Sequence, residues 1–235
     1  MPETVLLTSE ETHHLRHVLR MKTGSSCLLY DRSGREFVGR LEGFRANTQA
    51  EFKIVEPSKS AVIPQNRLRI SVAQAIPQDR KMDLIVEKSA ELGVFELVPL
   101  VSERTVVRIA RDRISQVLKR WRRIAEQTIK QSRVRTAPKI EDPIAFSDLC
   151  SRFGRYGEVL LLDPSDRVKT IRESFSPSND GSVRTVLLVI GPEGGFSPAE
   201  LEKAEASGAK IVRMGSGILK TDTAFVAAVS FLELV

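Results

Sequence analysis

The stretch LLVIGPEGGFSPAELEKA, residues 187–204, decides the fold of this chain. It opens on an unbroken apolar, β-branched run, which is typical of a strand buried on both faces of a parallel sheet. Ser197, Pro198 and Glu200 then form the signature of a capping box with proline in the first helical turn. The stretch therefore predicts a strand, a loop over residues 191–196 and a helix.

The loop at residues 191–196 has the place and composition of a ligand-binding loop. In open parallel sheets, ligands bind in the crevice at the carboxyl ends of the strands. Glycines there allow positive φ and let a ligand approach the backbone closely. The spacing matches neither GxGxxG nor a P-loop, and it contains no GxSxG nucleophile elbow. Taken alone, the loop fits either a ligand site or a tight turn without a ligand.

A second unit of the same kind closes the sequence, in KIVRMGSGILKTDTAFVAAVSFLEL (210–234). A short strand pattern is followed by Gly215 and Gly217, and a helix is predicted to begin with Thr221 or Asp222 as its N-cap. Two glycine-bearing loops at strand ends, separated by one helix, are expected to line the same crevice. This favours a ligand site for both loops.

The predicted order of strands and helices divides the chain into two parts. From Arg69 onward, strand and helix patterns alternate, which predicts an α/β fold with a parallel sheet and helices on its faces. The part before it has one capped helix pattern and three strand-like runs, which indicates a small β-rich domain. We expect domains at 1–66 and 67–235. The helices expected in these domains span residues 8–21, 78–92 and 112–132, and the early strands span 26–30, 36–44 and 49–55.

Positive charge is concentrated in one segment of the chain. The net charge is +6 over 235 residues, with 41% hydrophobic and 28% charged residues, as in an ordinary globular protein. Residues 108–135 carry ten Lys/Arg against only Asp112 and Glu126. Such a segment is either a solvated helix face or an anion-binding surface, and its density of cations favours binding of RNA phosphates.

Several other classes of site are disfavoured by the sequence. His13, His14 and His17 lack the accompanying ligands of a zinc site, so no metal is expected. Cys27 and Cys150 stand far apart and form no CxxC motif. No run is long and apolar enough to span a bilayer, and no signal-peptide pattern opens the chain. We expect a cytoplasmic protein.

Five segments, in order, resemble the bacterial ribosomal RNA small subunit methyltransferase E family. They cover nearly the whole chain, and the first and fourth are the most specific. The segments are HHLRHVLRMKTG (13–24), DRKMDLIVEKSAELGVFELVPLVSERTVV (79–107), KQSRVRTAPKI (130–140), IGPEGGFSPAEL (190–201) and GSGILKTDTA (215–224).

The resemblance implies a fold and an activity. The C-terminal part is expected to be a SPOUT-type α/β trefoil-knot domain, and the N-terminal part a small PUA-like β-barrel domain that binds RNA. The implied activity is S-adenosylmethionine-dependent methylation of N3 of a uridine in 16S rRNA. The implied partners are 16S rRNA or the small ribosomal subunit and a second copy of the chain, as a homodimer.

The resemblance also assigns candidate site residues. The carboxylates of Glu193 and Asp222 are candidates for assisting deprotonation of the uracil, and Arg104 and Lys220 for stabilising its anion. The expected cofactor-binding residues are Leu162, Ile190, Gly191, Gly195, Met214, Gly215, Ile218, Leu219 and Thr223. The expected RNA-binding residues are Arg16, Arg20, Arg122, Arg123 and Arg133.

The chain departs from the family pattern in its last motif. The family usually has arginine, arginine and glutamate where this sequence has Gly217, Lys220 and Asp222. Charge is kept at the second and third positions, and a guanidinium is lost at the first. Two alternatives follow: an RNA-binding protein of ribosome assembly with impaired catalysis, or a SPOUT methyltransferase that acts on another RNA.

Overall fold

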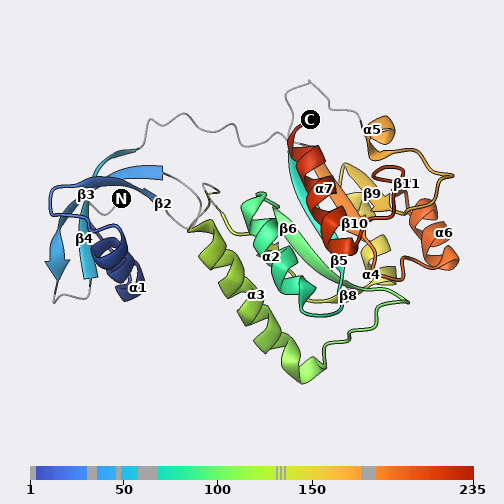
Figure 1. The fold of residues 1–235 in the computed structure, drawn as a ribbon, viewed down its shortest axis with the longest axis horizontal. Coiled ribbons are helices and arrows are strands. Elements are labelled where there is room, and N and C mark those ends of the chain that lie inside the picture. The colour runs from blue at the N-terminus through green and yellow to red at the C-terminus, as the bar shows by residue number, and fades with distance from the viewer. Residues whose placement is uncertain are drawn as a thin grey trace. The chain divides into compact units, whose positions relative to one another are not determined.

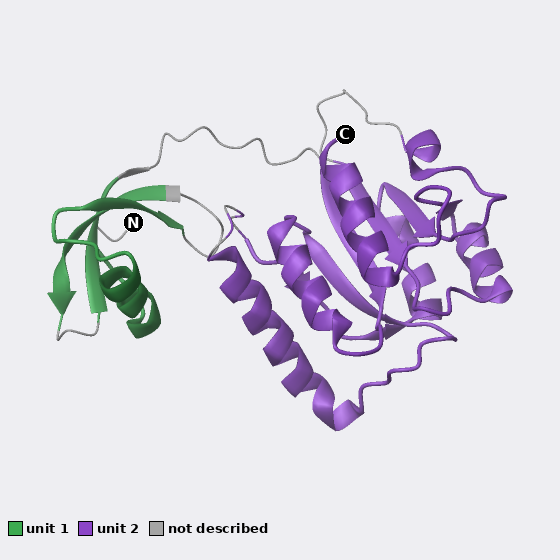
Figure 2. Ribbon diagram, in the orientation of Figure 1, with its two compact units in different colours: residues 1–63 green, residues 64–235 purple. Residues whose placement is uncertain are grey.

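The chain folds into two compact units, residues 1–63 and 64–235 (Figure 2). The computed structural model describes residues 4–30, 36–45, 49–57, 68–130, 132, 134, 136–175 and 184–235. The expected domain boundary at residue 66 and the expected RNA-binding residue Arg133 lie outside the described residues.

The first unit is an antiparallel sheet of four strands in the order β1-β4-β3-β2 (Figure 1). Its small core consists of Leu15, Leu41, Ala50 and Phe52, all buried. The strands agree with the three predicted runs and add a short one at the start. They are β1 (Thr4–Leu6), β2 (Ser26–Tyr30), β3 (Glu36–Arg45) and β4 (Gln49–Pro57).

The helix of the first unit is shorter than predicted. The capping box at Thr8 is confirmed, since the Thr8 hydroxyl accepts from the amide of Glu11 and the Glu11 carboxylate accepts from the Thr8 amide. The prediction of one helix over residues 8–21 is wrong, however. α1 (Ser9–His13) widens into a π-helical turn at His14–Val18, and the left-handed backbone of Arg20, at φ 50°, ends it.

The second unit contains a sheet whose pairings are all parallel, as the alternating pattern predicted (Figure 1). The strand order is β11-β9-β10-β5-β6-β7, and β8 also pairs with β6. Its strands are β5 (Leu68–Ala75), β6 (Glu96–Val101), β7 (Lys139–Ile140), β8 (Ile144–Ala145), β9 (Glu158–Leu162), β10 (Arg184–Ile190) and β11 (Lys210–Val212).

Helices cover both faces of this sheet, so the second unit has three layers. Successive strand side chains point to opposite faces. On β5, Ile70 and Val72 pack with α2, α3, α5 and α7, whereas Ala73 and Ala75 pack with α4 and α6. The helices are α2 (Lys81–Glu91), α3 (Ile114–Ile129), α4 (Phe146–Cys150), α5 (Ile171–Ser174), α6 (Pro198–Ala206) and α7 (Thr221–Glu233).

Several predicted helix ends are confirmed and two are corrected. The box at Ser197 caps α6, and Gly208, at φ 97°, follows its end. α2 begins at Lys81 rather than residue 78, because Asp79 and Arg80 have left-handed backbone. α7 begins at Thr221, as predicted, but its N-cap is Lys220 and no side chain caps it, so the predicted cap by Thr221 or Asp222 is wrong. Among the described residues, no helix combines the length and apolarity that crossing a membrane requires.

Candidate functional site

Two glycine loops meet at the carboxyl edge of the large sheet. The first glycine loop (residues 191–196) follows β10, and the second glycine loop (residues 214–219) follows β11. β9 lies between these two strands, so the loops flank the end of β9 at Leu162. Two residues after the end of the second loop, the hydroxyl of Thr221 donates to the carbonyl of Gly191 at 2.9 Å. The expected juxtaposition of the two loops is therefore present.

The first glycine loop is held from several sides. The guanidinium of Arg104 donates to the carbonyl of Gly194 at 2.8 Å. Gly195 has φ 67°, a left-handed conformation that other residues adopt only with strain. A Cβ on Gly191 would meet the ring of Phe196 at 3.1 Å, and that ring is buried. The shape of the loop is thus fixed by its own chain and by Arg104.

The Glu193 carboxylate is engaged in a bracing contact. It accepts from the Lys81 ammonium at 3.0 Å and from the amide of Gln78 at 3.2 Å. Partial burial on its own raises the pKa of Glu193, but these hydrogen bonds and one to its own backbone outweigh it, so the pKa lies below its usual value. The same pair raises the pKa of Lys81. Glu193 therefore joins the first glycine loop to the start of α2 as an ion pair.

Replacing Glu193 with Gln should make stability less dependent on pH. Because folding lowers the pKa of this carboxyl, its contribution to the free energy of unfolding is present above about pH 4.3, the unfolded value, and is lost as pH falls through the lower folded value. We expect Glu193→Gln to be less stable than the parent at pH 7, with the difference shrinking below pH 4. Urea unfolding of both proteins at the two pH values measures this, and a constant difference would contradict it.

Asp222 presents a different environment from Glu193. It is the second residue of α7 and half-buried, and its Oδ1 is buried without a hydrogen-bond partner in the described part of the chain. A buried oxygen without a donor is unfavourable unless another group supplies one. Lys220 precedes it on the loop and is exposed. The arrangement leaves the buried Oδ1 of Asp222 without a donor and places an exposed ammonium group, that of Lys220, two residues earlier in the sequence.

The second glycine loop offers open space beside apolar side chains. A Cβ on Gly215 or Gly217 would meet nothing within 4 Å. The side chain of Arg213 holds the loop by donating to the carbonyls of Gly215, at 2.8 Å, and Val168, at 3.1 Å. Ile218 is 84% exposed and Leu219 39%. An anchored backbone with free space and uncovered apolar groups suits a ligand with both polar and apolar parts.

The remaining expected cofactor residues lie at strand ends or on α7. Ile190 and Leu162 are the last residues of adjacent strands, paired in register. Met214 is half-buried and Thr223 is exposed in the first turn of α7. Ile190 and Leu162 lie beside the loops because the carboxyl ends of parallel strands meet at one edge of the sheet. Thr223 follows the second glycine loop on the first turn of α7.

Sequence reasoning missed residues that connect the site. Gln78 and Lys81 hold Glu193, and Thr221 reaches Gly191. Gln74, on β5, is fully buried and donates to Thr221 at 3.0 Å. Its signal in the sequence is a glutamine inside RISVAQAI, a strand that is otherwise apolar over its second half.

A cavity of about 660 Å³ lies away from the glycine loops. Its lining includes Arg122 from α3, Ile140 from β7 and Arg152. None of the expected cofactor or catalytic residues lines it. We place the candidate site at the glycine loops rather than at this cavity, because the bracing contacts of Glu193, Arg104 and Thr221 all hold the first glycine loop.

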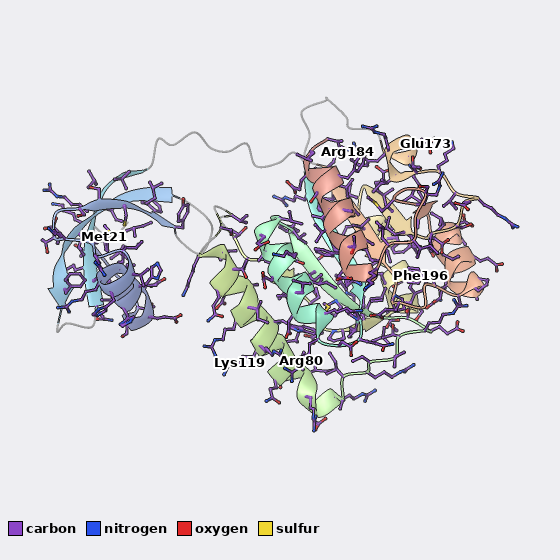
Figure 3. All side chains as sticks on the ribbon, in the orientation of Figure 1. Met21, Arg80, Lys119, Glu173, Arg184 and Phe196 are labelled. Carbon is purple, nitrogen blue, oxygen red and sulfur yellow. The ribbon has the colours of Figure 1, made fainter. Side chains whose placement is uncertain are left out.

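The cations of α3 differ in what they contact. Arg120 forms an ion pair with Asp83 of α2, and Arg122 donates to the carbonyl of Ile140 at 3.2 Å. Lys119, which is labelled in Figure 3, and Arg123 are exposed and form no ion pair within the described residues. In the first unit, Arg16 stacks over the ring of Phe44 at 5.3 Å, and Arg20 is exposed.

Comparison with known proteins agrees with this architecture. Residues 64–233 match the RNA methyltransferase domain family, and residues 7–60 match the RNA methyltransferase PUA domain. Ribosomal RNA small subunit methyltransferase E of Bacillus subtilis is 26% identical, over 98% of this chain and 90% of its own. The Aquifex aeolicus protein of that name is 33% identical, over 77% and 73%.

A solved structure is similar over almost the whole length. It is a ribosomal RNA small subunit methyltransferase E from Neisseria gonorrhoeae bound to S-adenosyl methionine, with a TM-score of 0.82 and 28% identity. The alignment covers 98% of this chain and 91% of that one. With a PUA-like first unit, a parallel α/β second unit and a match across both, the chain belongs to the RNA methyltransferase family.

Proposed function

We propose that this protein transfers a methyl group from S-adenosylmethionine to N3 of a uridine in 16S rRNA. The observation that carries the proposal is the meeting of the two glycine loops through Thr221 and Gly191 at the carboxyl edge of the sheet. The relatives named for small subunit rRNA methylation, one of them bound to S-adenosyl methionine, support the cofactor and the substrate.

The residues at the loops fit S-adenosylmethionine. The open backbone at Gly215 can receive polar groups of the cofactor, and Met214, Ile218 and Leu219 offer apolar contact to its ring and chain. When bound, the cofactor supplies an activated methyl carbon on a sulfonium, so the protein needs no covalent nucleophile. The task of the chain is then to align the uracil nitrogen and to remove its proton.

Asp222 is the residue we propose for the proton. N3 of uracil is an imide nitrogen and must lose a proton before or during attack on the methyl carbon. The carboxylate of Asp222, which is only half-buried, can accept a hydrogen bond from that N–H and then the proton itself. Lys220, exposed and two residues earlier, can stabilise the negative charge that develops on the uracil oxygens.

Glu193 and Arg104 serve the same site through the first glycine loop. Glu193 is occupied by Lys81 and Gln78, and Arg104 by the carbonyl of Gly194. Both side chains therefore hold the backbone that receives the cofactor. In this assignment the proton is taken by Asp222 rather than by Glu193.

RNA binding is proposed for both units. Residues 1–66 form the RNA-binding domain and 67–235 the methyltransferase domain, and Arg16, Arg20, Arg122, Arg123 and Arg133 contribute phosphate contacts. The substrate places the protein in the cytoplasm. We further propose a homodimer with a trefoil knot in each subunit; exposed Val226, Leu234 and Val235 on and after α7 support an apolar contact between copies.

Product analysis tests the reaction. The purified protein, S-adenosylmethionine and 16S rRNA or small subunits lacking the modification are incubated, and the RNA is digested to nucleosides. We expect 3-methyluridine. A ribose-methylated nucleoside would instead assign a different reaction, and binding of RNA without methyl transfer would assign a role in ribosome assembly only.

Charge reversal on α3 tests the RNA surface. Because Lys119 and Arg123 are exposed and unpaired within the described residues, Lys119→Glu with Arg123→Glu should weaken rRNA binding by about tenfold and flatten its dependence on salt. Affinity for S-adenosylmethionine should not change. Arg120→Glu is the matched control, since Arg120 is engaged by Asp83. Equal RNA affinity and salt slope in parent and double variant would exclude this face from RNA binding.

A further inference from the structure

Gln74 is a polar residue in the most buried strand of the sheet. It has 0% exposure on β5 and pairs in register with Ile190 of β10 and with Pro99 of β6. Its side chain points to the same face as Ile70 and Val72, the face that α7 covers. An amide at such a place is unfavourable unless its polar atoms are used.

The hydrogen bonds of Gln74 fix which way its amide points. Nε2 donates to the carbonyl of Ala75 at 2.9 Å and to the hydroxyl of Thr221 at 3.0 Å. A carbonyl can only accept, so the nitrogen and not the oxygen must face Ala75. Because the Thr221 oxygen accepts from Gln74, its own proton is free to be donated to the carbonyl of Gly191, at 2.9 Å.

These hydrogen bonds form a series in which each donor points the same way. The series runs from Gln74 on β5 to Thr221, the first residue of α7, and from Thr221 to Gly191, the first residue after β10. Gly191 opens the first glycine loop, and Thr221 follows the second. This series of hydrogen bonds therefore determines how the two loops are placed relative to each other.

The remaining atom of Gln74 shows that stability alone does not explain this residue. Oε1 is buried and has no hydrogen-bond partner in the described part of the chain. A buried acceptor without a donor destabilises the fold, and an apolar side chain of similar shape would remove that cost. Because Gln74 has this cost and its nitrogen bonds to Thr221 beside the glycine loops, we look for its role in the site.

From this we infer that Gln74 is a positioning residue for cofactor binding, which acts through Thr221 on the first glycine loop. The inference rests on the proposed binding of S-adenosylmethionine to the two loops. It assigns Gln74 no contact with the reacting atoms. Its effect is to orient the Thr221 hydroxyl toward Gly191.

Calorimetry with S-adenosylmethionine and thermal unfolding of the full chain test the inference together. Gln74→Met should raise the dissociation constant about tenfold while the unfolding temperature stays equal or rises. Thr221→Val, which removes the hydroxyl and keeps the shape, should weaken binding similarly, and Thr221→Ser should restore most of the affinity lost in Thr221→Val. Gln74→Met and Thr221→Val interrupt the same series of hydrogen bonds. The double variant Gln74→Met/Thr221→Val should therefore bind S-adenosylmethionine about as well as either single variant.

A matched control separates positioning from general stability. The buried hydroxyl of Ser89 donates to the carbonyl of Ile85 within α2. Ser89→Ala removes a buried hydroxyl-to-carbonyl bond that does not reach the glycine loops, and it should leave cofactor affinity unchanged. Two results would overturn this inference and leave the proposed cofactor standing. One is that Gln74→Met binds S-adenosylmethionine as tightly as a parent that itself binds it. The other is that the losses of affinity in Gln74→Met and Thr221→Val simply add in the double variant. A parent without measurable affinity would overturn the proposed cofactor and this inference with it.

Discussion

Asp222→Asn should slow methyl transfer by about 100- to 10,000-fold, the usual range for loss of a general base. The amide keeps the size of the side chain but cannot take the imide proton. Cofactor affinity and unfolding temperature should stay close to those of the parent. The variant should recover part of its rate as pH rises, since hydroxide can remove the proton in place of the carboxylate. Single-turnover rates from pH 6 to 10 measure both effects.

The structure makes this substitution more informative than the sequence did. Asparagine is as good an N-cap as aspartate, but Lys220 occupies the cap position and Asp222 makes no capping bond. A loss of rate therefore cannot be attributed to a lost helix cap. Glu193→Gln is the paired variant, because that carboxylate is held by Lys81. A parental rate and pH profile in Asp222→Asn would remove Asp222 from the mechanism. A larger loss of methyl-transfer rate in Glu193→Gln would identify Glu193 as the proton acceptor.

Gly215→Val should weaken S-adenosylmethionine binding by about 5- to 150-fold, which corresponds to about 1–3 kcal/mol of overpacking. A Cβ at Gly215 meets no atom of the protein within 4 Å, and this glycine is not in the left-handed region. The folded protein should therefore accept the side chain, and only a ligand at the loop should be displaced. Calorimetry measures the affinity, and thermal unfolding verifies the fold.

The choice of glycine matters for this test. Gly195 has φ 67°, so a valine there would strain the backbone whether or not a ligand binds. Gly217, which also has open space around it, is the matched position on the same loop. If both Gly215→Val and Gly217→Val bound S-adenosylmethionine with the affinity of the parent, the cofactor would not bind at the second glycine loop.

The sequence by itself determined the class of the fold and the approximate positions of its longer elements. The apolar run before Gly191 identified a buried parallel strand, and Ser197 with Glu200 identified the start of α6, because both signals are local. The strand ends then placed the two glycine loops at one edge, since all carboxyl ends of a parallel sheet lie together. Two of the five segments that resemble the methyltransferase E family lie on these same loops, and all five are read from the sequence alone, so the family could be recognised before the fold was known.

Only the tertiary structure decided how the site is held. Gln74 and Thr221 are 147 positions apart, and no local pattern predicts that an amide in one strand donates to a hydroxyl at the start of the last helix. The bracing of Glu193 by Lys81 and the unpaired oxygen of Asp222 likewise depend on which side chains meet across the sheet edge. Hydrogen bonds act over about 3 Å, so their partners are set by packing rather than by spacing along the chain.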